Sequence, residues 1–253
     1  MRLTRVALPA LLALSIAGTA SAQQPAGTIV QVTRQKVAPG MAQKYEAGRK
    51  KHMDWHRKMA DPWTWTIWEV TTGPDSGSYL VTTPNHQWQD FDTWNAKMAE
   101  GDGADAALNT VPTVASAETS YWALMPDHSL GGATSDVPPM ATLSIYYLKP
   151  GAGPKFTRAV RKMTDALKKG NWAGSRYTYV LANGGEVPAY ALFIPRKNMA
   201  DMQLPQPSLP SVVEKELGRE EADRVWEDMW DSVSRISSEM LVHRADLSYA
   251  PAK

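Results

Sequence analysis

The chain has 253 residues, of which 27 are Lys or Arg and 26 are Asp or Glu, and it contains no cysteine. The missing cysteine excludes disulfides, thiol nucleophiles and thiolate metal sites. The near balance of charge argues against a nucleic-acid-binding protein, which would show a basic patch or a high pI.

The first 22 residues are typical of a secretory signal peptide. A short positive segment, residues 1–5, precedes an apolar run over residues 6–17, and Ala20-Ser21-Ala22 provides a small-residue cleavage site. The apolar run is shorter than the roughly 20 residues that a membrane span needs. We therefore expect residues 1–22 to be removed, the mature protein to be periplasmic or secreted, and no membrane attachment after cleavage.

The mature sequence resembles itself at a shift of 111 positions. Residues 32–90 align without a gap, with Pro39-Gly40 on Pro150-Gly151 and Tyr79 on Tyr190, and the alignment gives ten identities in 59 positions. Self-similarity at a fixed shift indicates an internal repeat. The final segments align better at a shift of 121, which places Glu118 on Glu239.

Hydrophobic periodicity and turn residues predict the same elements in each copy. The first copy is expected to contain a strand over residues 28–37, a helix over 41–59, strands over 63–72 and 78–83, a second helical region without assigned bounds, and a last strand over 120–125. The second is expected to repeat them over residues 141–148, 154–169, 175–182, 189–194, a helical region that includes 220–240, and 240–246. Each copy therefore has the ferredoxin-like order β-α-β-β-α-β. The predicted units are residues 28–126 and 140–249, and the Pro/Gly/Ser-rich residues 127–139 link them.

The first strand leading to Pro39-Gly40, the long first helix and the aromatic second strand with Trp65 and Trp68 carry a family resemblance. On these features the chain resembles the dimeric α/β-barrel superfamily and its NIPSNAP-like branch. The resemblance implies two four-stranded sheets that pack face to face into a barrel. Because both copies lie in one chain, we expect an α+β fold of two tandem ferredoxin-like units that close the barrel within the chain, as a monomeric pseudo-dimer rather than a homodimer.

The two copies differ in polarity at equivalent positions. On the first helix, four residues at helical spacing in copy one are apolar in copy two: Tyr45, Arg49, His52 and His56 correspond to Phe156, Val160, Met163 and Leu167. On the strands, Arg34 corresponds to Ile145 and Glu69 to Val180. If copy two buries this helical face, copy one should bury it too, and buried charges cost several kcal/mol unless they are paired or liganded.

This exchange predicts a polar pocket in copy one. Arg34, Tyr45, Arg49, His56 and Glu69 would bind the ligand, and His52 would be the acid or base of any reaction near neutral pH. Two alternatives remain open. The helix could instead bury a stripe formed by Met41, Tyr45, Gly48, His52, Trp55 and Met59, and Arg34 or Glu69 could face the barrel interior.

His52 and His56 are also the candidate ligands for a metal ion or for haem. His52 and His56, four apart on a helix, could share a metal ion. However, no third ligand is evident beyond His86, Glu69 or Asp54, so no metal is predicted. No cofactor is predicted either, although several superfamily members bind haem through a histidine, and His52 followed by His56 would be the axial candidates.

The predicted function is that of an exported protein that binds a small molecule, either anionic or aromatic, with Arg34 and Arg49 holding an acidic group. The alternatives are a cofactor-free monooxygenase or isomerase of small aromatic or lactone-like substrates, and a haem-binding protein. A serine hydrolase is disfavoured because the chain contains no Gly-x-Ser-x-Gly sequence.

Overall fold

A computed structural model describes residues 28–131, 136–203 and 205–252. The expected signal peptide, residues 1–22, and part of the expected linker lie outside the described residues. The first half of the chain contains β1 (Ile29–Val37), α1 (Ala42–Lys58), β2 (Thr66–Val70), β3 (Tyr79–His86), α2 (Trp88–Asn109) and β4 (Val114–Leu124). The second contains β5 (Met140–Leu148), α3 (Gly153–Lys169), β6 (Tyr177–Asn183), β7 (Ala189–Arg196), α4 (Leu209–Leu217), α5 (Arg219–Ser232) and β8 (Val233–His243). Four short 3-10 helices are η1 (Val111–Thr113), η2 (Pro126–His128), η3 (Met199–Met202) and η4 (Ala245–Leu247).

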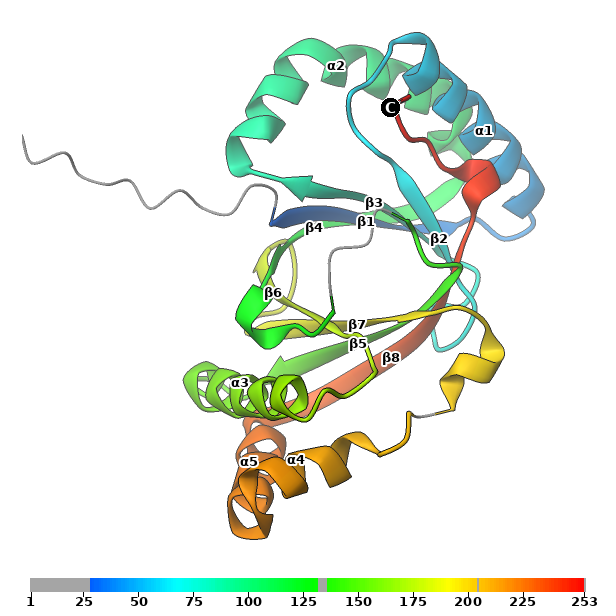
Figure 1. The fold of residues 1–253 in the computed structure, drawn as a ribbon. Helices are drawn as coiled ribbons and strands as arrows, with labels where there is room; N and C mark the ends of the chain where they lie inside the picture. Colours follow the sequence, from blue (N-terminus) through cyan, green and yellow to red (C-terminus); the bar gives the residue numbers. More distant parts are fainter. Residues whose placement is uncertain (1–27, 132–135, 204, 253) are drawn as a thin grey trace, which may run out of the picture.

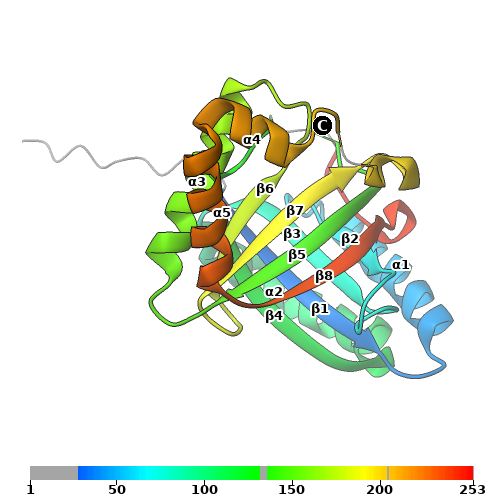
Figure 2. The ribbon, with the colours of Figure 1, turned by 90° about the horizontal axis from the view of Figure 1, so that it is seen from below.

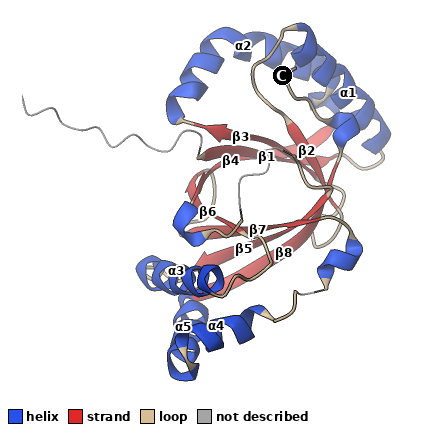
Figure 3. Ribbon diagram, in the orientation of Figure 1, coloured by secondary structure: helices blue, strands red, loops and turns tan. Residues whose placement is uncertain are grey.

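The eight strands form one closed antiparallel barrel in the order β1-β3-β2-β8-β5-β7-β6-β4. The four strands of each half are neighbours, and the halves join where β2 pairs with β8 and β4 pairs with β6. Helices α1 and α2 cover the outer face of the first half, and α3, α4 and α5 cover that of the second (Figures 1 and 3). Figure 2 shows the same two helical layers on opposite sides of the strands. The protein therefore has an α+β fold in which the sheet lies between helical layers.

Side chains alternate between the two faces of each strand, as the period of two requires. In β1, Val30, Val32, Arg34 and Lys36 face the barrel interior, while the intervening Gln35 contacts α1. The apolar core between sheet and helices is separate in each half. In the second half it is built on buried side chains of α3 and α5, and in the first half it is rich in tryptophan. No helix among the described residues is long and apolar enough to cross a membrane.

Three details of the sequence prediction are wrong. The last strand of the first half, expected over residues 120–125, begins at Val114 instead. The helix expected over residues 220–240 ends at Ser232, and β8 begins at once at Val233. The register of the last strands also differs, because Val37 pairs with Val114 in the first half and Leu148 pairs with Val233 in the second. Val114 and Val233 are thus equivalent, and so Glu239 corresponds to Ser120 rather than to Glu118.

Candidate functional site

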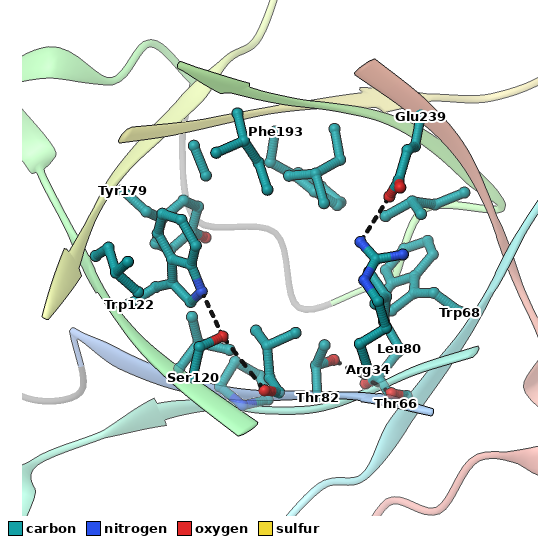
Figure 4. A pocket seen from close by; sticks show the side chains of 18 of the residues that line it. Arg34, Thr66, Trp68, Leu80, Thr82, Ser120, Trp122, Tyr179, Phe193 and Glu239 are labelled. Atoms are coloured by element: carbon teal, nitrogen blue, oxygen red, sulfur yellow. Dashed lines mark hydrogen bonds and ion pairs between the residues drawn. The ribbon is translucent and has the colours of Figure 1, made fainter. Parts of the chain in front are cut away.

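The barrel encloses a cavity of about 960 Å³. Its walls are mostly aromatic and aliphatic and come from both halves; they include Val32, Trp68, Leu80, Trp122, Leu143, Ile145, Tyr147, Tyr179, Leu181, Phe193 and Leu241. Figure 4 shows Trp122 and Tyr179 on one side of this space, with Trp68 opposite them and Phe193 above. A cavity of this size and lining can hold a drug-sized ligand, since such sites typically measure about 300–1,000 Å³.

Two polar arrangements face each other across the cavity (Figure 4). On one wall, Nη2 of Arg34 donates to Oε2 of Glu239 at 2.7 Å, and Nη1 of Arg34 lies 3.5 Å from Oδ2 of Asp75. On the opposite wall, Nε1 of Trp122 donates to the Ser120 hydroxyl at 2.9 Å. The Arg34 guanidinium is therefore already paired with two carboxylates.

These arrangements break the internal symmetry of the barrel. The residue equivalent to Arg34 is Ile145, and the residue equivalent to Glu239 is Ser120 from the strand register. The ion pair thus has no counterpart in the other half of the cavity. An asymmetric ligand would find a charged, paired wall on one side and a hydroxyl with an indole on the other.

Three titratable groups that line the cavity are held in a neutral or paired form. The hydrogen bond from Lys36, helped by the nearby Arg34, lowers the pKa of Asp75. Burial raises the pKa of Tyr179 to about 12, so its hydroxyl keeps its proton and can donate to a ligand. Burial lowers the pKa of His86 and therefore favours its neutral imidazole, and the ring lies tilted against that of Trp63 with ring centres 3.9 Å apart.

The predicted helical face of copy one is buried. Tyr45, Arg49, His52 and His56 are at most 4 % exposed, and their counterparts in α3 are buried as well. The alternative stripe is wrong, because Met59 is 50 % exposed. This face lies against β1 and α2, however, and none of its four side chains lines the barrel cavity.

Tyr45 and Arg49 form one group with a residue of β1. The Tyr45 hydroxyl donates to Oε1 of Gln35 at 2.7 Å, and Nη2 of Arg49 donates to the same oxygen. The Arg49 guanidinium also lies over the Tyr45 ring, 5.5 Å from its centre. Burial is the main cause of the raised pKa of Tyr45. The group is a packed polar contact between α1 and the outer face of the sheet.

His52 and His56 form a second group with three aspartates. Nδ1 of His52 lies 2.8 Å from Asp105, and Nδ1 of His56 lies 2.7 Å from Asp61. Both Nε2 atoms approach Oδ1 of Asp102, at 3.2 Å and 3.3 Å. Burial would lower the pKa of His56, but the carboxylates of Asp102 and Asp61 outweigh it and raise that pKa.

Asp61 anchors this second group to the aromatic core. Its Oδ1 accepts hydrogen bonds from the Trp63 backbone N–H and Trp94 Nε1, and its Oδ2 accepts from Trp65 Nε1 and His56 Nδ1. The side chain is fully buried. Burial alone would raise the pKa of Asp61, but these donors lower it. The carboxylate is therefore ionised and has four donors around it.

Glu69 belongs to a third group, on the outer face of β2. Its Oε2 accepts from Nη1 of Arg244 at 3.0 Å, and the same guanidinium makes two hydrogen bonds to Glu46. The hydrogen bonds to Glu46 and Asp246 raise the pKa of Arg244, and the hydrogen bond from Arg244 lowers the pKa of Asp246 to about 2. Glu69 therefore fixes η4 to β2 and does not face a ligand cavity.

The prediction of one polar pocket is thus wrong in its geometry. The six residues are split over three outer-face groups and the barrel interior, and only Arg34 lines the cavity. Arg34 and Arg49 cannot share an acidic ligand, because they lie on opposite faces of β1. Glu239 and Asp102 were not among the residues predicted from the sequence. Side chains alternate between the two faces of a strand, so this alternation could have indicated which residues face the barrel interior. No local pattern in the sequence indicates a role for Asp102.

Haem does not fit at the histidines predicted as axial ligands. His52 and His56 point their Nε2 atoms at Asp102, and neither lines the cavity that is large enough for a porphyrin. The histidine that lines this cavity is His86. Its Nε2 is hydrogen-bonded to the Thr83 hydroxyl at 2.7 Å and is therefore already occupied. No step of the function is therefore assigned to haem.

Comparison with known proteins shows the fold. No protein-family model and no curated protein matches the sequence. A candidate monooxygenase from Lactobacillus acidophilus is similar in structure, with a TM-score of 0.55 and 10 % identity over 89 % of this chain and 97 % of that one. An anthrone oxidase-like protein has a TM-score of 0.55 and 11 % identity over 91 % and 95 %. A chlorite dismutase variant from Candidatus Nitrospira defluvii has a TM-score of 0.54 and 6 % identity over 86 % and 92 %.

These neighbours are dimeric α/β-barrel folds, so the superfamily resemblance in the sequence is confirmed at the level of fold. Each similarity extends over nearly the whole of both chains. The identities are too low to transfer an activity, and function rests on the cavity and its residues.

Proposed function

We propose that the mature chain is an exported binding protein for a neutral, aromatic small molecule held inside the barrel. The observation that supports this most directly is the cavity of about 960 Å³ with aromatic walls from both halves. Burying an aromatic ligand against such walls gives favourable apolar contact, and offset or edge-to-face ring contacts add about 0.5–1.5 kcal/mol each.

The charges around the cavity favour a neutral ligand over an anionic one. The cationic residues that line it are Arg34, Lys36 and Arg235, and the acidic ones are Asp75, Glu118, Asp136, Glu186 and Glu239. The acidic side chains outnumber the basic ones, and Arg34 and Lys36 are both paired with Asp75. An anion would have to displace a carboxylate from Arg34, while a hydroxyl or carbonyl group could use Ser120, Thr82 or the Tyr179 hydroxyl.

The proposal also includes an internal duplication, a branch of the superfamily, a monomeric state and a location outside the cytoplasm. We regard the two halves as products of a tandem duplication, because they repeat one element order and share the turn Pro-Gly before α1 and α3. The first strand and helix support a NIPSNAP-like branch, and closure of the barrel within one chain supports a monomer. The signal-peptide sequence supports a periplasmic or secreted location.

Cofactor-free oxygenation of the bound molecule is the second candidate. It is favoured by the likeness to a candidate monooxygenase and to an anthrone oxidase-like protein. His52, which we predicted as the acid or base, is outside the cavity, so the groups available beside the ligand are Tyr179, His86 and the Arg34–Glu239 pair. Oxygen uptake with anthrone as substrate separates this candidate from simple binding: sustained uptake above the protein-free rate supports it, and none excludes it for this substrate.

The binding proposal is tested with two fluorescent probes that share a ring system. N-Phenyl-1-naphthylamine is neutral, and 1-anilinonaphthalene-8-sulfonate carries one negative charge. We expect the neutral probe to bind the mature protein with enhanced emission, and the sulfonate to bind at least about tenfold more weakly, since excluding the anion by about 1.4 kcal/mol suffices for that ratio.

Two variants locate the site. Ser237 lines the cavity and Ser238, the next residue of β8, is exposed on the outer face. Ser237→Trp should fill part of the cavity and abolish binding of the neutral probe, while Ser238→Trp should leave binding unchanged. Equal binding by both variants would show that the probe does not enter the barrel.

A further inference from the structure

A second site lies outside the barrel, between α1 and α2. Nε2 of His52 and Nε2 of His56 both approach Oδ1 of Asp102, at 3.2 Å and 3.3 Å. The three potential ligand atoms lie within 4.8 Å of one another. None of these residues lines the cavity that the proposed function uses, so this site is independent of it.

The other nitrogen of each ring is fixed by a carboxylate. Nδ1 of His52 pairs with Asp105 and Nδ1 of His56 pairs with Asp61. Because a carboxylate accepts, each Nδ1 is assigned a proton, and in the neutral form of each ring the Nε2 lone pair then faces Asp102. Histidines that bind metals almost always donate their second ring N–H to a carboxylate or carbonyl in this way. The arrangement thus supplies both ligands and the groups that orient them.

The His56 ring has a polar atom without a partner. Its side chain is 1 % exposed, and Nε2 makes no hydrogen bond within the described residues even though the Asp102 oxygen is near. A buried nitrogen left unpaired costs about 1–3 kcal/mol. Three carboxylates, Asp61, Asp102 and Asp105, also surround the two imidazole rings. A cation between the Nε2 atoms and Asp102 would satisfy the lone pairs and offset the negative charge.

Small residues bring the two helices close enough for such a site. A Cβ at Gly48 of α1 would lie 1.8 Å from the Asn109 carbonyl oxygen, and a Cβ at Gly101 of α2 would lie 2.9 Å from the Trp55 ring. Of the 22 residues of α2, the buried ones are Phe91 and Trp94, both in its first two turns. Its second half therefore has no fully buried apolar side chain, and its contacts with α1 include the polar groups of Asp102 and Asp105.

We infer that His52, His56 and Asp102 bind one divalent transition-metal ion, of the kind represented by Zn²⁺, which attaches the second half of α2 to α1. Both distances from Nε2 to the Asp102 oxygen fit this ion, because ligand bonds of 2.0–2.1 Å in a tetrahedron separate ligand atoms by about 3.3 Å. Two imidazoles and a carboxylate are ligands that Zn²⁺ and its neighbours in the first transition row accept. The Asp102 side chain is 25 % exposed, so water completes the coordination.

Titration calorimetry on the mature protein, purified without a histidine tag and stripped with EDTA, tests the site with Zn²⁺. We expect one ion per chain, and Co²⁺ in its place should give a visible absorption band typical of four-coordinate cobalt. Hydrogen exchange should slow in residues 95–109 when Zn²⁺ is added. Binding of no ion, or slowed exchange elsewhere only, would overturn the inference and leave the histidines as protonated partners of the aspartates.

Variants assign the ligands. Asp102→Asn keeps the shape of the side chain and should weaken Zn²⁺ binding by at least about 100-fold. Asp105 only orients His52, so Asp105→Asn should weaken Zn²⁺ binding by about 10–100-fold. His128→Asn and Asp92→Asn remove a histidine and an aspartate elsewhere and should bind as the wild type does. The His56 ring is fully buried, so Asp102→Asn decides the question if His56→Gln does not fold. Unchanged binding by folded Asp102→Asn would refute the site.

Discussion

Replacing Asp61 by asparagine is the sharpest test of how the first half of the protein is held together. The Asp61 carboxylate is fully buried and accepts four hydrogen bonds, from the Trp63 backbone and from the side chains of His56, Trp65 and Trp94. Asparagine has nearly the same shape, but one of its two polar atoms is an NH₂ group, which faces donors on either side.

The expected cost follows from counting unpaired groups. The better orientation of Asn places the NH₂ group where Oδ2 was, toward Trp65 and His56. Even if His56 shifts its proton to Nε2 and accepts one N–H, the indole N–H of Trp65 and the second amide N–H have no acceptor. Two buried unpaired donors cost about 1–3 kcal/mol each, so Asp61→Asn should lose about 2–6 kcal/mol of unfolding free energy.

Urea unfolding measures this loss, followed by circular dichroism near neutral pH and with EDTA present so that no metal contributes. Asp92→Asn is the control, because Asp92 is exposed on α2 and surface substitutions usually change stability by less than about 0.5 kcal/mol. If Asp61→Asn lowers the free energy of unfolding by less than about 1 kcal/mol more than the control does, the hydrogen bonds of this carboxylate do not hold the tryptophan cluster together.

Three further predictions concern packing, the cavity and pH. Gly48→Ala should destabilise the protein by about 1–3 kcal/mol because its methyl group would overlap α2, whereas Gly103→Ala, with open space around it, should stabilise by up to about 1 kcal/mol through helix propensity. Arg34→Met should cost about 3 kcal/mol by leaving Glu239 buried and unpaired, and adding Glu239→Leu should restore most of it. Burial lowers the pKa of His86, so the folded state resists its protonation, and wild-type stability should fall relative to His86→Gln as pH drops below about 6.5.

Urea unfolding measures all three, and each has its own contrary result. Equal effects of Gly48→Ala and Gly103→Ala would mean that α1 and α2 can separate at no cost. A double variant no more stable than Arg34→Met would mean that the stranded Glu239 charge is not the cause of the loss. A stability difference between the wild type and His86→Gln that stays constant from pH 7 to pH 5 would mean that His86 titrates alike in the folded and unfolded states.

Local patterns in the sequence predicted most of the elements but misplaced the start of the last strand in each half. The expected helix over residues 220–240 extends into β8, because residues four apart share a face both on a helix and on a strand. Met229 and Val233, or Ile236 and Met240, therefore fit either element. The structure separates them at Ser232, where the chain passes directly from α5 into a strand that pairs along β5.

Comparison of the two halves of the sequence shows that a helical face with Arg49, His52 and His56 replaces an apolar face. Its equivalence to the buried face of α3 implies that it is buried as well. The groups that these side chains contact, in contrast, follow from the three-dimensional packing. Their partners Gln35, Asp61 and Asp102 come from a strand, a loop and a second helix, and the Glu239 that pairs with Arg34 lies 205 residues away. Periodicity assigns a residue to a face of its own element, whereas ligand geometry depends on how elements distant in sequence are packed together, and that packing is set by the closure of the whole barrel.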